Sequence, residues 1–313
     1  LGGYSLIMKI FVYIILAIIF SFFSYYFYFK YSFLSNLNAH SQILETSLGS
    51  IEYTLEGNNG PVLLFIHGTP GGYDQTTQAT NKFRVLTPSR PGYLRTSIAL
   101  GKTPLEQAKV FKVLIDELGI DKVIVMGVSG GGPSSIEFAA KFPENTHGLI
   151  AFEAVSYAED LNKVDDEIIN ASDLGLWIQL SLISFLDNEK FASAMLPSPG
   201  NRKRLLADPK NIKNLKELVW SIWPLSARKE GFKNDYEQFK NFLLPLDEVK
   251  VPTLVVHGDE DVNVDINHAK ELVKKIKGAK LYVVKGGDHY MSSTHAGEID
   301  PLIENFILQY SLQ

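Results

Sequence analysis

A serine near the middle of the chain stands in a glycine-rich turn, where it could act as a nucleophile. Residues 123–133 read VIVMGVSGGGP, so an apolar, largely β-branched run ends in a Gly-x-Ser-x-Gly pattern centred on Ser129, and a helical pattern follows over 134–142. Strand, tight turn and helix in this order are the setting of a nucleophile elbow, and the helix N-terminus favours developing negative charge. The pattern predicts nucleophilic attack by Ser129 on a carbonyl group.

Two other kinds of glycine-rich loop fit this segment poorly. A P-loop has Lys and Ser or Thr after its last glycine, whereas Pro133 and Ser134 follow here. A dinucleotide-binding loop needs G-x-G-x-x-G, which the segment lacks. A plain structural turn remains the alternative.

A serine hydroxyl needs a base to take its proton and a third group to orient that base. Residues 280–289, KLYVVKGGDH, end an apolar run at His289, and residues 251–261, VPTLVVHGDED, end one in an acidic turn. Both follow the C-terminal ends of expected strands, where open α/β sheets build their sites. The order serine, acid, histidine also agrees with a hydrolase triad.

Together these motifs resemble the α/β-hydrolase family from about residue 51 to the end of the sequence. The resemblance rests on the order and spacing of four segments: HGTPGG at 67–72, GVSGG at 127–131, HGDED at 257–261 and GGDH at 286–289. It implies Ser129 as nucleophile, His289 as general base and then acid, and Asp261 as the orienting carboxylate. The other acidic residues that remain open for this role are Asp259, Glu260 and, after the preceding strand, Glu153.

Acyl transfer also needs N–H groups where the oxyanion forms, and backbone amides are already oriented for this. One donor is expected from Gly130, the residue after the nucleophile. The second is expected from the loop at 67–72, where Pro70 lacks an N–H, so the amide of Thr69 is the candidate. Asp74 and Gln75 are candidates to brace this loop. A surface Gly/Pro turn is the alternative.

The segment at 88–97, PSRPGYLRTS, departs from the pattern of many family members. Ser89 stands where relatives have Asp, and Leu94 replaces a glycine. These departures, together with a serine rather than a carboxylate at the elbow, disfavour epoxide hydrolases and dehalogenases. The first two departures also weaken an assignment to prolyl aminopeptidases.

Composition narrows the cofactors and partners. The chain has 313 residues, no cysteine and a formal net charge of −5, which disfavours nucleic acid as a partner. Because it also lacks His-x-His and His-Glu-x-x-His patterns, we expect no metal and no cofactor. His67 and His257 each precede a glycine at a strand end and are expected to fix loop geometry. His268 and His295 are expected to be solvated.

The N-terminal segment differs from the rest of the sequence. Residues 10–29 carry no charge, lie between Lys9 and Lys30, and end among many Phe and Tyr residues. Twenty such residues can span a bilayer as a helix with an interfacial aromatic belt. We expect residues 1–40 to be a single-pass membrane anchor with the hydrolase domain outside the cytoplasm. A removed signal peptide and a core helix are the alternatives.

The remaining residues, 41–313, alternate strand and helix patterns, which predicts an α/β fold with a mostly parallel sheet and helices on both faces. Strands are expected at 51–55, 62–66, 83–86, 122–126, 148–152, 253–256 and 280–284. Helices are expected at 105–118, 134–142, 266–276 and 298–309. A helical cap is expected over about 155–247, with helices at 163–169, 174–186, 189–195, 212–222 and 236–243.

These expectations converge on a serine hydrolase that cleaves an ester in a small-molecule substrate. An aminopeptidase or a carbon–carbon bond hydrolase could use the same triad, and a non-catalytic binding protein is the alternative of another class. An aminopeptidase needs acids facing the pocket, and the acids of the early cap cluster in one stretch: Glu159, Asp160, Asp165, Asp166 and Glu167. The later cap is apolar and holds Trp177, Trp220 and Trp223, which favours an acyl group. The sequence does not predict the oligomeric state.

Overall fold

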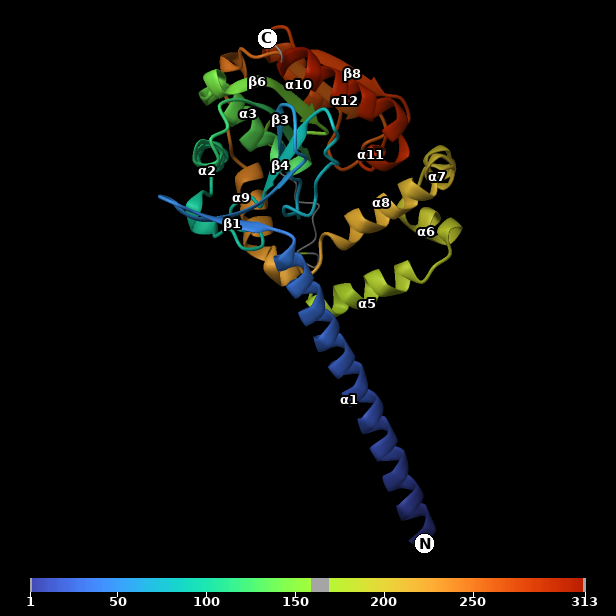
Figure 1. Ribbon diagram of the computed structural model, residues 1–313. Helices are drawn as coiled ribbons and strands as arrows, with labels where there is room; N and C mark the ends of the chain where they lie inside the picture. Colours follow the sequence, from blue (N-terminus) through green and yellow to red (C-terminus); the bar gives the residue numbers. More distant parts are fainter. Residues whose placement is uncertain (1, 159–168, 312–313) are drawn as a thin grey trace. The chain divides into compact units, whose positions relative to one another are not determined.

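The computed structural model describes residues 2–158 and 169–311. The chain divides into two compact units, Leu1–Gln42 and Ile43–Gln313, both drawn in Figure 1. The first unit consists mainly of one helix, α1, at Gly2–Ala39. Its part Leu6–Ala39 is long and apolar enough to cross a membrane, a test that a signal sequence also passes. Because none of its most apolar stretch is buried, a core helix is not supported.

Within the described residues, the sheet has eight strands in the order β1-β2-β4-β3-β5-β6-β7-β8. Strands β2 and β4 pair antiparallel, and every pair from β4 to β8 is parallel. The expectation of a mostly parallel sheet is therefore confirmed. The strand bounds are Gln42–Thr46, Gly49–Glu56, Val62–Ile66, Arg84–Pro88, Val123–Val128, Thr146–Phe152, Thr253–Gly258 and Lys280–Val284 for β1 to β8. Sequence reasoning missed β1, a largely exposed strand without a continuous apolar run.

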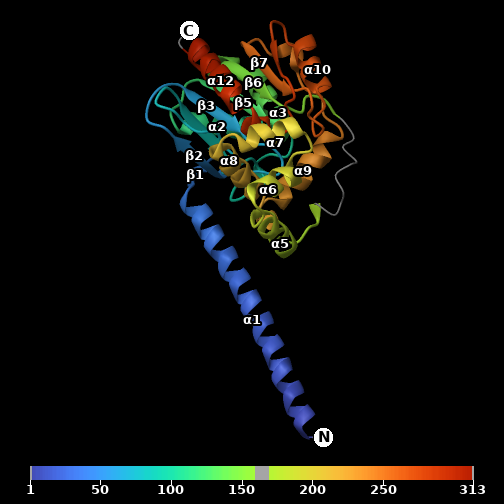
Figure 2. The ribbon, with the colours of Figure 1, turned by 90° about the vertical axis from the view of Figure 1, so that its right-hand side faces the viewer.

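Helices cover both faces of this sheet. On one face, α2 (Pro104–Glu117), α3 (Gly132–Lys141) and α10 (Asn267–Lys275) pack into one apolar core. On the other, α11 (Met291–Thr294) and α12 (Ala296–Ser311) pack against the alternate strand residues, and Figure 2 shows α12 lying across the strands. Central strands buried on both faces read as nearly continuous apolar runs, which is why the sequence predicts them well.

Local signals set where α2 begins. Thr103 caps the helix through its side chain, and Glu106 bonds back to the backbone of Thr103, forming a capping box. Pro104 occupies the first turn, where its missing N–H leaves no partner unsatisfied. The observed start lies one residue from the predicted one.

A helical segment is inserted between β6 and β7. Its described helices are α5 (Asp173–Ser184), α6 (Asn188–Met195), α7 (Pro199–Leu206), α8 (Pro209–Trp220) and α9 (Lys229–Phe239). The helix expected at 163–169 lies, except for its last residue, outside the described residues. The helix expected at 236–243 is displaced, since α9 starts seven residues earlier. Sequence reasoning missed α7, whose sequence PGNRKRLL has too few apolar residues to show a helical period.

Candidate active site

The elbow forms where the sequence places it. Strand β5 ends at Val128, a short 3₁₀ turn covers Ser129–Gly131, and α3 begins at Gly132. Ser129 has φ 50°, a left-handed conformation that is costly for a residue with a side chain and is found at functional turns. A Cβ on Gly127 would lie 2.1 Å from Ser135 Oγ, so no larger residue fits there.

The three residues expected to form the triad lie together. His289 Nε2 is 3.1 Å from Ser129 Oγ, and His289 Nδ1 is 2.8 Å from Asp261 Oδ2. With its proton on Nδ1, His289 donates to Asp261 and can accept the hydroxyl proton of Ser129. This is the arrangement that lets an imidazole act as base and an acid orient it. The loops after β5, β7 and β8 supply the three side chains.

Asp261 is held more firmly than its acidic neighbours. Its Oδ1 accepts from the amides of Asn263 and Val264 at 2.8 and 3.0 Å. Although burial opposes ionisation, the hydrogen bond and charge of His289 keep the pKa of Asp261 below its ordinary value. Asp259 is exposed, and it accepts from the Gly286 amide at 2.6 Å. That bond joins the acid loop to the histidine loop.

A second carboxylate, Glu153, lies beside the histidine. It follows β6, is 1% exposed, and places Oε2 3.8 Å from His289 Nδ1, while Oε1 has no hydrogen-bond partner. Burial raises the pKa of Glu153 to about 8. Burial alone would lower the pKa of His289, but Glu153, Asp261 and Asp288 together raise it to about 9.

Glu153, Asp261 and His289 also place potential metal-ligand atoms within 4.8 Å of one another. Both ring nitrogens of His289 are engaged, one by Asp261 and one by Ser129. A cation would have to displace one of these bonds. The donor set therefore fits a hydrogen-bonded triad better than a metal centre.

The loop at 67–72 lies against the nucleophile. A Cβ on Gly68 would be 3.3 Å from Ser129 Cβ, and one on Gly130 would be 2.1 Å from Thr69 Oγ1. The two residues expected to supply oxyanion donors are therefore in contact. Gln75 donates to the Pro70 carbonyl at 2.8 Å, which is a brace of the kind expected.

Two arginines that sequence reasoning did not single out form hydrogen bonds with this loop. Arg90 is buried and pairs with the buried Asp235 at 2.6 Å. Arg228 donates to the Gly71 carbonyl at 2.7 Å and pairs with Asp74. Asp235 and Arg228 belong to the inserted segment, more than 140 residues away in the chain, so no local pattern could have revealed them.

The four histidines considered above are all buried, and the expectation for two of them is wrong. His67 donates to the Gly68 carbonyl and accepts from the Arg90 amide, as a residue that fixes loop geometry would. His257 lies 2.8 Å from the Val264 carbonyl. His268 and His295 are 1% and 4% exposed rather than solvated. Each turns a ring nitrogen to a partner inside the fold: the Ser156 amide for His268 and the Thr294 hydroxyl for His295.

The departures at 88–97 are accommodated locally. Ser89 donates to Glu52 at 2.9 Å and accepts from the Tyr73 amide, so its hydroxyl is part of a buried hydrogen-bond network. Leu94 has φ 50°, a left-handed backbone conformation that glycine adopts at lower cost.

The inserted segment contacts the histidine loop. Asn201, on α7, donates to Asp288 Oδ2 at 2.9 Å, next to His289, and is 1% exposed. Tyr290 packs on an apolar core formed by α6, α7 and α8. Of the three tryptophans, Trp177 and Trp223 are buried.

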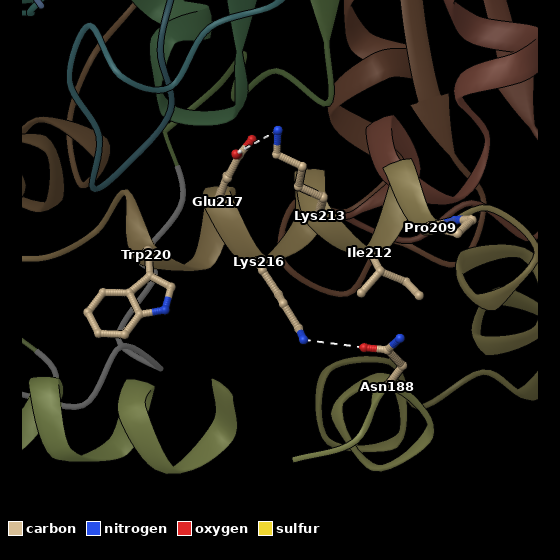
Figure 3. A pocket seen from close by; sticks show the side chains of 7 residues that line it. All are labelled: Asn188, Pro209, Ile212, Lys213, Lys216, Glu217 and Trp220. Carbon is tan, nitrogen blue, oxygen red and sulfur yellow. Dashed lines mark hydrogen bonds and ion pairs between the residues drawn. The ribbon is translucent and has the colours of Figure 1, made fainter. Parts of the chain in front are cut away.

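Trp220 lines a cavity of about 430 Å³ between α6 and α8, shown in Figure 3. Its polar wall includes Lys216, which donates to Asn188 at 3.3 Å, and Lys213, which lies 3.7 Å from Glu217. None of the predicted triad residues lines this cavity. It is therefore separate from the site described above.

Comparison with known proteins agrees with this geometry. Residues 61–296 match the family described as alpha/beta hydrolase fold. The chain is 30% identical over 259 residues to an uncharacterized hydrolase, YcgS, of Bacillus subtilis (strain 168), covering 77% of this chain and 88% of that protein. It is 24% identical to a 2-hydroxy-6-oxo-6-phenylhexa-2,4-dienoate hydrolase of Burkholderia cepacia, covering 80% and 89%.

Solved structures give the same fold. An alpha/beta hydrolase fold protein from Nakamurella multipartita is 30% identical, with a TM-score of 0.76 over 85% of this chain and 98% of that one. A thermophilic esterase from Thermogutta terrifontis is 20% identical, with a TM-score of 0.61 over 87% and 99%. The second likeness concerns the fold alone.

Proposed function

Because this chain belongs to the alpha/beta hydrolase fold family, we propose that it is a serine hydrolase that cleaves carboxylic esters in small-molecule substrates. One observation carries the proposal: His289 bridges Ser129 Oγ at 3.1 Å and Asp261 Oδ2 at 2.8 Å. A hydroxyl in this position can lose its proton as it attacks, which a binding protein would not need.

The proposed reaction proceeds by two acyl transfers. Ser129 Oγ attacks the ester carbonyl carbon while His289 Nε2 takes its proton, and Asp261 stabilises the resulting imidazolium. The amides of Thr69 and Gly130 donate to the oxyanion. When the tetrahedral intermediate collapses, His289 gives its proton to the leaving alcohol. Water then attacks the acyl-enzyme with His289 again as base, which releases the acid and restores Ser129.

A second candidate is hydrolysis of a carbon–carbon bond, favoured by the names of several curated relatives. A dienoate substrate carries a carboxylate, which a buried site holds best with a cation. Among the described residues, the buried arginines are Arg90 and Arg228, and both are already paired with carboxylates. This supports an uncharged ester over a dienoate. The acids proposed for an amine site, Glu159 to Glu167, lie outside the described residues.

Three substrate classes separate these candidates. We expect nitrophenyl esters of short acids to be cleaved, with each further methylene gaining no more than roughly 1 kcal/mol. We expect little cleavage of amino-acid nitroanilides or of 2-hydroxy-6-oxo-6-phenylhexa-2,4-dienoate. A kcat/KM for the dienoate above that for every ester would replace the ester proposal with the carbon–carbon one.

We further propose that α1 anchors the chain in a membrane, with the hydrolase unit outside the cytoplasm. Support comes from the length and exposed apolar surface of Leu6–Ala39. A signal sequence is the alternative, and the mature N-terminus distinguishes the two.

A further inference from the structure

A buried ion pair, Arg90 with Asp235, hydrogen-bonds to the loop that carries Thr69. Arg90 and Asp235 are 1% and 2% exposed, and the guanidinium donates to both carboxylate oxygens, at 2.8 and 2.6 Å. Burial alone would lower the pKa of Arg90, but the charge of Asp235 raises it above its ordinary value. The pair is therefore a fixed ionic contact between the loop after β4, which carries Arg90, and α9, which carries Asp235.

Arg90 contacts three consecutive residues of the loop. It donates to the His67 carbonyl at 3.0 Å, the Gly68 carbonyl at 3.1 Å and Thr69 Oγ1 at 3.0 Å. The Thr69 hydroxyl in turn donates to Asp235 Oδ2. Because this hydroxyl both accepts and donates, one side-chain rotamer of Thr69 is fixed.

That rotamer places the Thr69 side chain against Gly130, the other residue expected to donate to the oxyanion. Its Oγ1 would lie 2.1 Å from a Cβ on Gly130, so the space beside Gly130 is filled by Thr69. Phe239, one turn after Asp235 on α9, would lie 3.0 Å from the same Cβ. Helix α9 thus contacts both residues whose amides are proposed to bind the oxyanion.

We propose that Asp235 is a positioning residue that sets the oxyanion site through the Thr69 hydroxyl. The inference rests on the proposed function. Replacing a buried ion pair by apolar residues is often neutral or stabilising, so stability alone does not account for Arg90 and Asp235. Oriented amides, in contrast, depend on their exact placement, and a shift of about 1 Å can cost about 100-fold in rate.

The test compares two hydroxyls that donate to the same carboxylate oxygen. Tyr93 donates to Asp235 Oδ2 at 2.5 Å, as Thr69 does. The Thr69 side chain also provides the atom nearest to a Cβ built on Gly130. Thr69→Val should lower kcat for a nitrophenyl ester by about 10- to 100-fold with KM changed less than about threefold. Thr69→Ser restores the hydroxyl and should restore kcat.

Tyr93→Phe is the matched control. It removes the hydrogen bond to Asp235 and a longer one, at 3.4 Å, from Arg90. It should lower the Tm as much as Thr69→Val while leaving kcat within about threefold of the wild type. Asp235→Asn should match Thr69→Val in kcat, but it leaves Arg90 buried without its charge partner and can fail to fold. The decisive comparison is therefore between the two hydroxyl variants.

Equal losses of kcat in Thr69→Val and Tyr93→Phe, or no loss in either, would overturn the positioning role. Hydrogen exchange of the loop at 67–75 gives a readout that needs no turnover: it should accelerate in Thr69→Val and not in Tyr93→Phe. Unchanged exchange in Thr69→Val contradicts the inference even if the enzyme proves inactive on esters. Failure of the wild type to hydrolyse any ester counts against the proposed function alone.

Discussion

Glu153 Oε2 lies 3.8 Å from His289 Nδ1, on the side of the ring where Asp261 Oδ2 lies at 2.8 Å. Two carboxylates therefore face one imidazole nitrogen, and only Asp261 is within hydrogen-bond distance. Glu153 has φ 47°, a strained conformation for a residue with a side chain, which is consistent with a position fixed by its surroundings. Asp261 can therefore orient the imidazole through a hydrogen bond, whereas Glu153 acts on it only through its charge.

The first prediction ranks the acids. Asp261→Asn should reduce kcat by about 10³- to 10⁴-fold, because an amide at this position favours the wrong tautomer of His289. Glu153→Gln and Asp259→Asn should lower kcat by less than about tenfold, because neither side chain bonds the imidazole and so neither fixes its tautomer. A larger loss in either of these two than in Asp261→Asn would move the orienting role to that residue.

The second prediction concerns pH. His289 must be neutral to accept a proton, so kcat/KM should rise as the pH rises through its pKa. With that pKa raised to about 9, the acidic limb of the profile should lie above the ordinary histidine value of about 6.5. Glu153 is the largest of the influences that raise it, so Glu153→Gln should shift the limb to lower pH.

The profile is measured with spontaneous ester hydrolysis subtracted at each pH. Because Glu153 and His289 titrate as a coupled pair, the midpoint belongs to the pair. A wild-type limb near 6.5, or a limb unmoved by Glu153→Gln, is incompatible with this account of the site's electrostatics.

The third prediction concerns the contact between α7 and the histidine loop. Asn201→Ala leaves the buried Asp288 Oδ2 without its donor and should lower the free energy of unfolding by about 1–3 kcal/mol. For a domain of this size, that is a fall in Tm of about 2–4 °C per kcal/mol. Asn234→Ala, which removes an exposed hydrogen bond to the Lys102 carbonyl, is the control and should change stability by less than about 0.5 kcal/mol. Equal effects would show that α7 contributes little to the histidine loop.

The fourth prediction concerns α1. If Leu6–Ala39 spans a bilayer, the full chain should remain in the membrane pellet after alkaline carbonate washing. A chain shortened to begin near Asn38 should be soluble and keep its ester activity, since the second compact unit begins at Ile43. Release of the full chain by carbonate contradicts the anchor, and a mature N-terminus near His40 identifies a removed signal.

Much of the sheet could be predicted because its signals are local. The strands β3 and β5 are buried along nearly their whole length, so their apolar runs are unbroken. The elbow follows from the glycines around Ser129, and the triad's order follows from the strands that carry Asp261 and His289. Each of these signals spans about ten residues.

The parts that could not be predicted depend on distant contacts. Arg90 meets Asp235 across 145 residues, and Asn201 meets Asp288 across 87. In the sequence, Asn201 begins a polar run, Asn-Arg-Lys-Arg, that indicates a solvated helix face. His268 is expected in solvent for the same reason, since it lies in a largely charged and polar stretch of α10. Its ring is in fact buried and stacks on that of Tyr157, with the ring centroids 3.8 Å apart.

Labelling with a fluorophosphonate probe tests the central claim most directly, because the probe reacts with an activated serine and needs no knowledge of the substrate. The account predicts that the wild type is labelled on Ser129, that Ser129→Ala is not labelled, and that His289→Ala is labelled far more slowly. In turnover of a nitrophenyl ester, the double variant should be little slower than either single variant, since the two residues act as a unit. Labelling that persists in Ser129→Ala, or a folded wild type that does not react, would contradict the account.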